Sequence, residues 1–494
     1  MTPSATAVPS PFALEAILVL GAGAVLVLLV ARPLSTRPFA AAATGALFAI
    51  VAGASVVGGE VRRAVAFETM RTYPNAMDGA AGVQVGPVPA STELAVLALC
   101  IVAAIALLLV PVLELQVSAH IPEATALLLL GTSGAVALAA AADLLQAVIG
   151  LETLALSAAT LVALGRGERP LEAAFKYFVL GAISLAALLY GVGLIYLGTG
   201  SFAFPSAAQL SGNGLVLAGA VLVALGFAFE LAVFPLHWGA LDAYTAAAPG
   251  LAGYVMSASK LAAAFALGRL VVAAGLPVAQ VLVWIGALTI LWGTFGALAQ
   301  RNLRRMLAYS AVTHAGFIAL AAGSGRQGPV TAAFYAAVYG GMAMLVFAAL
   351  AGHPGGEWES GRVGESERTA PPLPRSPALR FGPVRASALA LGLFSLGGIP
   401  PTPGFWAKLA VLVAAWQSAG PLATLIAAAG GVFSVLYYLR PLPDLFAEMK
   451  AAAPAGLARP VAVPAVLLAT ILVAVLGLFP NLVWTLARGL PPGS

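Results

Sequence analysis

The sequence carries very little charge. Only 9% of its 494 residues are Asp, Glu, Lys or Arg, whereas 61% are hydrophobic and the mean hydropathy is +0.99. So few polar groups could not cover the surface of a soluble globule. The composition therefore excludes a soluble enzyme or binding module and predicts a multi-pass membrane protein.

Cysteine is almost absent. The single Cys100 lies in an apolar run, which excludes an intrachain disulfide, a CxxC zinc site and a four-thiolate iron–sulfur cluster. A nucleotide-binding glycine motif is also lacking, because Gly21-Ala-Gly23 continues to Leu26 where a third glycine would stand. We therefore expect no redox centre, bound cofactor or metal in this chain. The net charge of +5 comes from arginines scattered through short loops, which argues against nucleic-acid binding.

Long apolar runs define the fold. At about 20 residues per span, the chain contains about fourteen candidate transmembrane helices, so we predict an all-α polytopic membrane protein. The first run lacks a positive leader and a cleavage site, and we expect it to be a retained helix. The predicted segments are 12–31, 38–57, 91–111, 122–142, 144–165, 172–197, 214–236, 245–270, 278–299, 303–322, 329–351, 384–414, 421–440 and 461–484.

Basic residues orient the chain. Of the 24 basic residues, 16 fall in odd-numbered loops, and 6 fall in even-numbered loops or the C-terminal tail. The positive-inside rule then places the odd loops in the cytoplasm and both termini on the outer side. We expect the protein in the bacterial cell (inner) membrane.

Prolines break two of the predicted spans. Pro235 ends the run "LVALGFAFELAVFP", and "GGIPPTPG" at 397–404 splits another. Broken helices at membrane depth occur where they line a cavity or are packed in protein. The breaks fall in predicted helices 7 and 12, and an odd offset of five inverts a repeat relative to the membrane. We therefore predict broken helices 7 and 12 within two inverted five-helix repeats, helices 4–8 and 9–13.

Two long loops complete the predicted organisation. Residues 58–90 are expected to face outward, whereas 353–383 is polar and Pro-rich and is expected to be a flexible cytoplasmic insert or simple spacer. The predicted domains are 1–121 with helices 1–3, 122–270 as the first repeat, 278–440 as the second repeat with the insert, and 441–494 with the last loop and helix 14.

Charged residues inside the apolar runs are the strongest functional signal. Only four lysines occur, and Lys260 and Lys408 lie within predicted spans, while Glu152 and Glu230 interrupt two others. Ionisable groups at membrane depth are costly and mark functional sites. Burial favours their neutral forms and a nearby opposite charge favours ionisation, so such groups can load and release protons. This pattern predicts a path for protons or cations. Structural ion pairing or snorkelling is the alternative for the lysines.

Six motifs, spread from about Asp143 to Tyr438, carry a family resemblance. They are "ADLLQAVIGLETLALS" with Glu152, "LEAAFKYFVLGAISLAALLYGVGLIYLGTGS" with Lys176, "FPLHWGALDAY" with His237 and Asp242, "SASKLAAAFALGRL" with Lys260, "QRNLRRMLAYSAVTHAGF" with His314, and "LFSLGGIPPTPGFWAKLAVL" with Lys408. The sequence resembles the antiporter-like membrane subunits of respiratory complex I, and "ASK" and "KYFVLGA" favour the N subunit among them.

The resemblance implies a role for each matched position. In this family a helix 5 glutamate is coupled to a helix 7 lysine, a helix 8 lysine relays the proton, and a helix 12 lysine hands it to the far side. Glu152, Lys260 and Lys408 match three of these four positions. The resemblance therefore predicts that they form the centre of a proton path.

The chain departs from the family at the fourth position. The family's "FKLSLVPFH" reads "FELAVFPLH" here and has Glu230 in place of the lysine. Two close carboxylates in a low-dielectric bundle do not both ionise easily. We therefore predict that Glu230 is either protonated, sharing a proton with Glu152, or paired directly with Lys260. Smaller departures are Gly239 and Leu241, where the family has Trp and Pro.

Other ionisable residues have weaker signals. His237 and His314 are further candidates because imidazole titrates near physiological pH, although each could instead satisfy a backbone carbonyl. Lys176 and Glu172 lie at the start of helix 6, where interface anchoring and function are both open. Asp143 is predicted to be a helix-end residue.

Three functions remain open at this point. The resemblance implies a proton-translocating subunit of NADH:quinone oxidoreductase, a translocase whose NADH, FMN, iron–sulfur clusters and quinone belong to partner subunits. Its expected partners are the other membrane subunits of complex I, the peripheral redox arm through them, and the lipid bilayer. A subunit of a cation/proton antiporter or of a related hydrogenase-type membrane complex would share the same buried charges. A membrane enzyme with its own redox centre, such as haem on His237 and His314, has no supporting motif.

Overall fold

The described part of the chain is helical. A computed structural model describes residues 11–29, 44–54, 91–113, 120–165, 167–351, 383–443, 445–446 and 462–488, and these ranges contain no β-strand. The predicted loop 58–90 and, apart from its last residue, the insert 353–383 lie outside the described residues. Besides a short helix at Thr44–Ala54, the helices are α1 (Pro11–Leu29), α4 (Thr92–Leu113), α5 (Ile121–Ala139), α6 (Leu144–Ala163), α7 (Glu168–Thr199), α8 (Ala207–Gly212), α9 (Gly214–Leu231), α10 (Trp238–Ala246), α11 (Pro249–Ala274), α12 (Leu276–Ala299), α13 (Leu303–Ala322), α14 (Gly328–Leu350), α15 (Pro383–Gly397), α16 (Pro403–Ser418), α17 (Pro421–Leu439), α19 (Val463–Leu478) and α20 (Pro480–Arg488).

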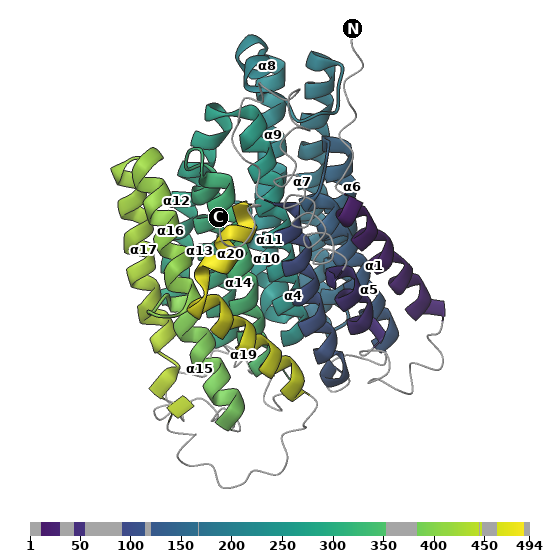
Figure 1. Cartoon of the computed structure of the whole chain (residues 1–494), viewed down its shortest axis with the longest axis vertical. Coiled ribbons are helices and arrows are strands. Elements are labelled where there is room, and N and C mark those ends of the chain that lie inside the picture. The colour runs from purple at the N-terminus through teal and green to yellow at the C-terminus, as the bar shows by residue number, and fades with distance from the viewer. Residues whose placement is uncertain are drawn as a thin grey trace, which may run out of the picture.

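The helices form an elongated bundle whose members run mostly along its length (Figure 1). Nine of the described helices are long and apolar enough to cross a membrane, and α19 with α20 makes a tenth if the bent pair is one span. Helices satisfy their own backbone hydrogen bonds, which is why apolar spans take this form in lipid. The protein is therefore a multi-pass helical membrane protein.

Two helices occupy the centre of the bundle. The most apolar stretch of α14 is 94% buried and that of α11 is 89% buried, whereas that of α7 is only 22% buried. The exposed face of α7 carries large apolar side chains such as Phe175 and Leu197. Polar groups on α11 and α14 are thus shielded from both lipid and water, whereas α7 lies at the periphery.

Glycines allow close crossings of neighbouring helices. A Cβ on Gly134 of α5 would lie 2.6 Å from the backbone nitrogen of Leu154 in α6, and one on Gly286 of α12 would lie 2.5 Å from that of Leu320 in α13. Small residues let backbones approach in this way, and dispersion then holds the pair together. These contacts fix α5 against α6 and α12 against α13.

Two spans are broken near their centres. α9 ends at Leu231 with Ala232 in the left-handed region (φ 64°), and the chain resumes as α10. α15 ends at Gly397, Gly398 has φ +80°, and α16 follows. The short helix α10 was not predicted, because its nine residues include Asp242 and fall between the two apolar runs.

The last predicted span, 461–484, is not straight. Its two helices, α19 and α20, are bent by 83°. Pro480 has no backbone N–H and disfavours a helical conformation at Phe479, which has φ −125° and ψ 58°. A single apolar run therefore contains two helices of different direction.

Candidate functional site

Lys260 lies in the middle of α11 and is completely buried. Its Nζ donates a hydrogen bond to the Tyr244 hydroxyl at 3.2 Å and lies 4.8 Å from the centroid of the same ring. The Tyr339 ring lies 5.9 Å from the nitrogen on another side. Aromatic faces attract a cation, and the attraction is stronger where water is excluded. Snorkelling, the alternative considered from the sequence, does not describe this side chain.

Glu230 is the last residue but one of α9 and is 2% exposed. Neither of its carboxyl oxygens has a hydrogen-bond partner among the described residues. The charges of Lys260 and of half-buried Glu152 on α6 both act on it. The direct ion pair with Lys260 that the sequence left open is not formed, and the lysine nitrogen donates its hydrogen bond to Tyr244.

Lys408 lies in the second turn of α16 and reaches back across the helix break. Its Nζ donates to the carbonyl oxygens of Leu396 at 3.0 Å and Gly397 at 2.8 Å, and to the Ser434 Oγ at 2.8 Å. The two carbonyls belong to the end of α15, where the negative end of the helix dipole favours a cation. A Cβ on Gly398 would lie 2.9 Å from the Lys408 Cδ, so this position needs glycine for space as well as for its φ. The break therefore forms the lysine site.

His314 lies on α13 between the two lysines. Its Nδ1 hydrogen-bonds with the Tyr335 hydroxyl at 2.8 Å and its Nε2 with the Tyr438 hydroxyl at 3.1 Å. The charges of both Lys260 and Lys408 act on the imidazole. Its ring lies 4.8 Å from that of Tyr339, which also faces Lys260. The histidine does not bond a backbone carbonyl among the described residues; both its nitrogens face phenol groups.

The sequence analysis missed this set of buried tyrosines. Tyr244, Tyr335, Tyr339, Tyr437 and Tyr438 are all at most 2% exposed. Two of them, Tyr335 and Tyr339, are four residues apart and so share a helix face. Two tyrosines at this spacing within an apolar run could have predicted that their hydroxyls meet inside the bundle.

His237 belongs to an aromatic cluster. It is fully buried in the break after α9, where its Nε2 accepts a hydrogen bond from the Trp292 Nε1 at 2.9 Å. Its ring also lies beside those of Phe234 and Trp238. Among the described residues, the side chain of His237 contacts these aromatic rings and neither buried lysine.

The weaker candidates lie outside the buried set, and Lys176 lies in the third turn of α7 instead of at its start. Lys176 forms ion pairs with Glu172 at 2.6 Å and Asp242 at 3.6 Å, and Asp242 also binds Arg305 at 3.0 Å. All four groups are at least one-third exposed, so the network stabilises only weakly. Asp143 is the N-cap of α6, accepting a hydrogen bond from the Gln146 backbone N–H, as predicted for a helix-end residue.

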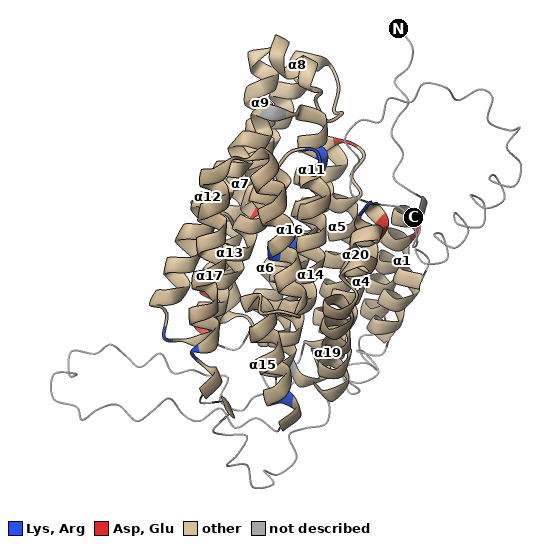
Figure 2. Cartoon of the chain, turned by 60° about the vertical axis from the view of Figure 1, so that its left-hand side comes forward, with Lys and Arg blue, Asp and Glu red and all other residues tan. Residues whose placement is uncertain are grey.

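Charged residues are otherwise sparse along the bundle. Figure 2 shows basic positions at mid-height near α14 and α16, with the remaining charges mostly towards the ends of the helices. Among the described residues, no three His, Cys, Asp or Glu side chains are grouped in a way that could hold a metal ion. The mid-bundle site is thus one of lysines, carboxyls, a histidine and phenols.

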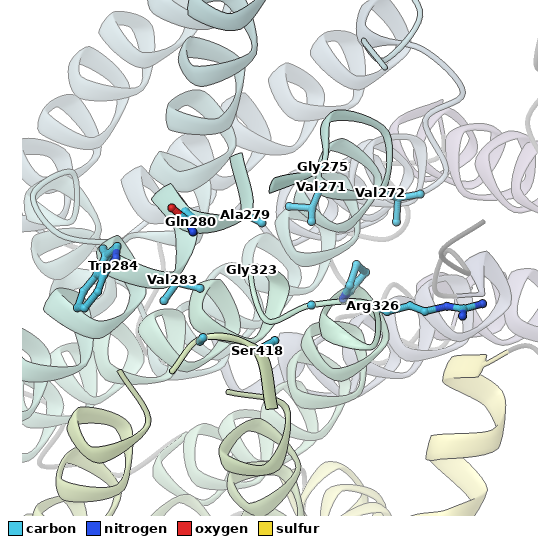
Figure 3. Close-up of a pocket in the computed structure, with 13 residues that line it drawn as sticks. Val271, Val272, Gly275, Ala279, Gln280, Val283, Trp284, Gly323, Arg326 and Ser418 are labelled. Carbon is cyan, nitrogen blue, oxygen red and sulfur yellow. The ribbon is translucent and has the colours of Figure 1, made fainter. Parts of the chain in front are cut away.

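A cavity of about 410 Å³ lies away from these residues. Figure 3 shows it between the end of α11, the start of α12 and the loop before α14, with Ser418 closing one side. Trp284 and Gln280 line it, and none of the buried lysines or carboxyls does.

A multi-pass bundle with two broken spans and ionisable groups buried at its centre defines a membrane protein of the ion-translocating class. The chain belongs to the NADH:quinone oxidoreductase/Mrp antiporter transmembrane family, whose model matches residues 141–434. The predicted family resemblance is therefore confirmed.

Within this family, the chain is similar to proteins named as subunit N. NADH-quinone oxidoreductase subunit N of Methylobacterium nodulans is 36% identical over 326 residues, which cover 64% of this chain and 65% of that protein. The subunit N of Deinococcus radiodurans is 35% identical over 378 residues, covering 73% and 74%.

Solved structures agree in fold. A chain of respiratory complex I from Thermus thermophilus with bound aureothin superposes with a TM-score of 0.73 at 28% identity, covering 96% of this chain and 99% of that one. A chain of the Mrp complex from Dietzia sp. DQ12-45-1b superposes with a TM-score of 0.67 at 22% identity, covering 94% and 96%. The second likeness is one of fold alone.

Proposed function

We propose that this chain is the proton-translocating membrane subunit, of the N type, of an NADH:quinone oxidoreductase. The observation that carries the proposal is the pair of buried lysines, Lys260 and Lys408, neither of which has a carboxylate partner within ion-pair distance among the described residues. A lysine held without a counter-ion in a low-dielectric bundle can lose and regain its proton as its surroundings change. The family relationship supports the same function.

The proposed path runs through the buried candidates in order. The charges of Glu152 and Lys260 act on Glu230, and those of Lys260 and Lys408 act on His314. Glu230 has no hydrogen-bond partner among the described residues, and it lies at the end of α9, where the helix dipole disfavours a carboxylate. We propose that it acts in its protonated form. His237 is retained as a candidate at the same break, with its aromatic contacts favouring a supporting role.

The proposed architecture has fourteen spans and two inverted five-helix repeats. The first repeat would contain α5, α6, α7, α9 with α10, and α11, and the second α12, α13, α14, α15 with α16, and α17. Two features support it: the breaks occupy corresponding places, and glycine crossings join both α5 to α6 and α12 to α13. We further propose that both termini face outward, and that redox cofactors, NADH and quinone belong to partner subunits.

Purification of the native complex tests this function. A mild-detergent preparation should contain flavin- and iron–sulfur-bearing subunits and catalyse quinone reduction by NADH. Copurification with antiporter subunits alone, without flavin or iron–sulfur absorbance, would instead support the antiporter alternative.

A further inference from the structure

The hydrogen bonds between Lys408 and His314 leave one link open. Lys408 donates to Ser434 at 2.8 Å, and His314 bonds with Tyr438 at 3.1 Å. Ser434 and Tyr438 are four residues apart on α17, so they point from the same face of that helix. Among the described residues, the Ser434 and Tyr438 hydroxyls do not hydrogen-bond to each other.

Tyr437 lies at this open link. Its side chain is completely buried, its ring centroid lies 4.5 Å from that of Tyr438, and its hydroxyl lies near those of Ser310, Thr313, Ser434 and Tyr438. Among the described residues it nevertheless completes no hydrogen bond of ordinary geometry. A buried hydroxyl without a partner is destabilising, so such a group calls for a physical explanation.

We propose that Tyr437 is the relay residue that carries protons between His314 and Lys408; this inference rests on the proposed function. A hydroxyl can donate one proton while accepting another, whereas the Phe317 ring, which also faces Lys408, exchanges none. A small shift of the side chain would let the hydroxyl bond to Tyr438 on one side and to Ser434 on the other. Tyr437 then completes a chain of exchangeable protons.

The transfer is balanced at every atom. The protonated imidazole of His314 gives its Nε2 proton to the Tyr438 oxygen while Tyr438 passes its own proton to Tyr437. Tyr437 passes its proton to Ser434, and Ser434 passes its proton to the neutral amine of Lys408. Each oxygen gains one O–H bond and loses one, so the histidine ends neutral and the lysine ends as ammonium.

The first test removes only the hydroxyl. Tyr437→Phe should be compared with wild type in the whole complex, reconstituted into proteoliposomes, by measuring protons moved per NADH oxidised. The matched control is Tyr254→Phe, because Tyr254 is equally buried but its hydroxyl bonds Thr132 and Leu128 on α5. Tyr437→Phe should lose as much proton transport as Lys408→Ala, while Tyr254→Phe should match wild type.

A solvent-isotope measurement separates relay from packing. If Tyr437 carries the proton, the ratio of transport rates in H2O and D2O should rise in Tyr437→Phe, because the interrupted transfer becomes limiting. An assembled Tyr437→Phe complex with wild-type transport and isotope ratio overturns the inference. If the variant does not assemble, Ser434→Ala breaks the same link from the other end and should give the same loss; wild-type transport in that variant would also overturn it.

The outcomes distinguish this inference from the proposed function. Wild-type transport in Lys260→Ala and Lys408→Ala would remove the proposed function itself. Impaired lysine variants together with a fully active Tyr437→Phe would remove only the relay.

Discussion

At the scale of single residues, Lys260 is distinguished by what surrounds it. Within the described ranges its nitrogen contacts phenol groups instead of a carboxylate, so its charge is not fixed by a permanent partner. We predict that Lys260→Ala lowers proton transport by this subunit at least about tenfold, since a positioned proton-transfer group typically contributes more than this. Proton uptake by proteoliposomes, together with quinone reduction, measures the effect.

Lys176 provides the matched control for this prediction. It is also a lysine, but it is half-exposed and paired with Glu172 and Asp242. Exposed ion pairs contribute little, so Lys176→Ala should assemble and transport protons at near wild-type rates. Equal transport in an assembled Lys260→Ala complex would contradict the role of the buried lysine.

Glu230 gives a second residue-scale prediction. Glutamine has nearly the shape of a protonated glutamate but cannot release a proton. Because Glu230 is buried and has no hydrogen-bond partner in the part of the chain that the structure describes, we expect Glu230→Gln to assemble with unchanged thermal stability and to transport protons several-fold more slowly. The unfolding midpoint of the purified complex checks the expected stability, and its transport rate checks the expected slower transport. Full transport by the variant would leave this position a structural substitution.

At the scale of elements, the break between α15 and α16 creates the environment of Lys408. It brings the carbonyl end of α15 to the Lys408 nitrogen, and it requires close backbone packing. A Cβ on Gly404 would overlap the Ser395 carbonyl oxygen. The lysine environment and the tight crossing therefore depend on the same few residues.

We predict that Gly404→Ala destabilises the protein by about 1–3 kcal/mol or more, the usual range for overpacking. The control is Gly193→Ala on the exposed face of α7, where a Cβ meets nothing within 4 Å and alanine should be neutral or slightly stabilising. Thermal unfolding in detergent compares the two. An unchanged midpoint in Gly404→Ala would show that the break can relax.

At this break the sequence predicted the local backbone but not the contacts of the lysine. "GGIPPTPG" was sufficient to predict a break beside Lys408, because proline lacks the N–H that a continuous helix needs. The partners of the lysine could not be predicted, since they include Ser434, 26 residues away on another helix. Likewise, α10 was missed because it is too short and polar to resemble a span.

At the scale of the whole molecule, the charge distribution predicts which ends face the cytoplasm. The sole native cysteine, Cys100, is buried, so single introduced cysteines can report orientation with little background. Ser211 lies on a predicted outer loop and Arg169 on a predicted inner one, and both are exposed. In intact cells a membrane-impermeant maleimide should label Ser211→Cys and not Arg169→Cys.

Inverted membrane vesicles should reverse this pattern, and the unmodified protein should remain unlabelled in both. Labelling of Arg169→Cys from outside would invert the proposed topology. It would also place the Glu172, Lys176 and Asp242 network on the outer side.

The sequence by itself determined the class of protein and the charged residues that lie inside its spans. Apolar content, the odd-loop arginines, the two breaks and the charges of Glu152, Glu230, Lys260 and Lys408 can all be read along the chain. They are local properties, because span length and proline chemistry do not depend on distant residues.

Only the tertiary structure decided which groups meet. It placed Tyr244 instead of Glu230 on the Lys260 nitrogen, and it set His314 between phenols of α14 and α17. The spans are apolar on every face, and lipid is as apolar as a helix interior, so periodicity does not reveal which face is inward. These partners, which are 16 to 124 residues apart in sequence, were therefore brought together by helix packing alone.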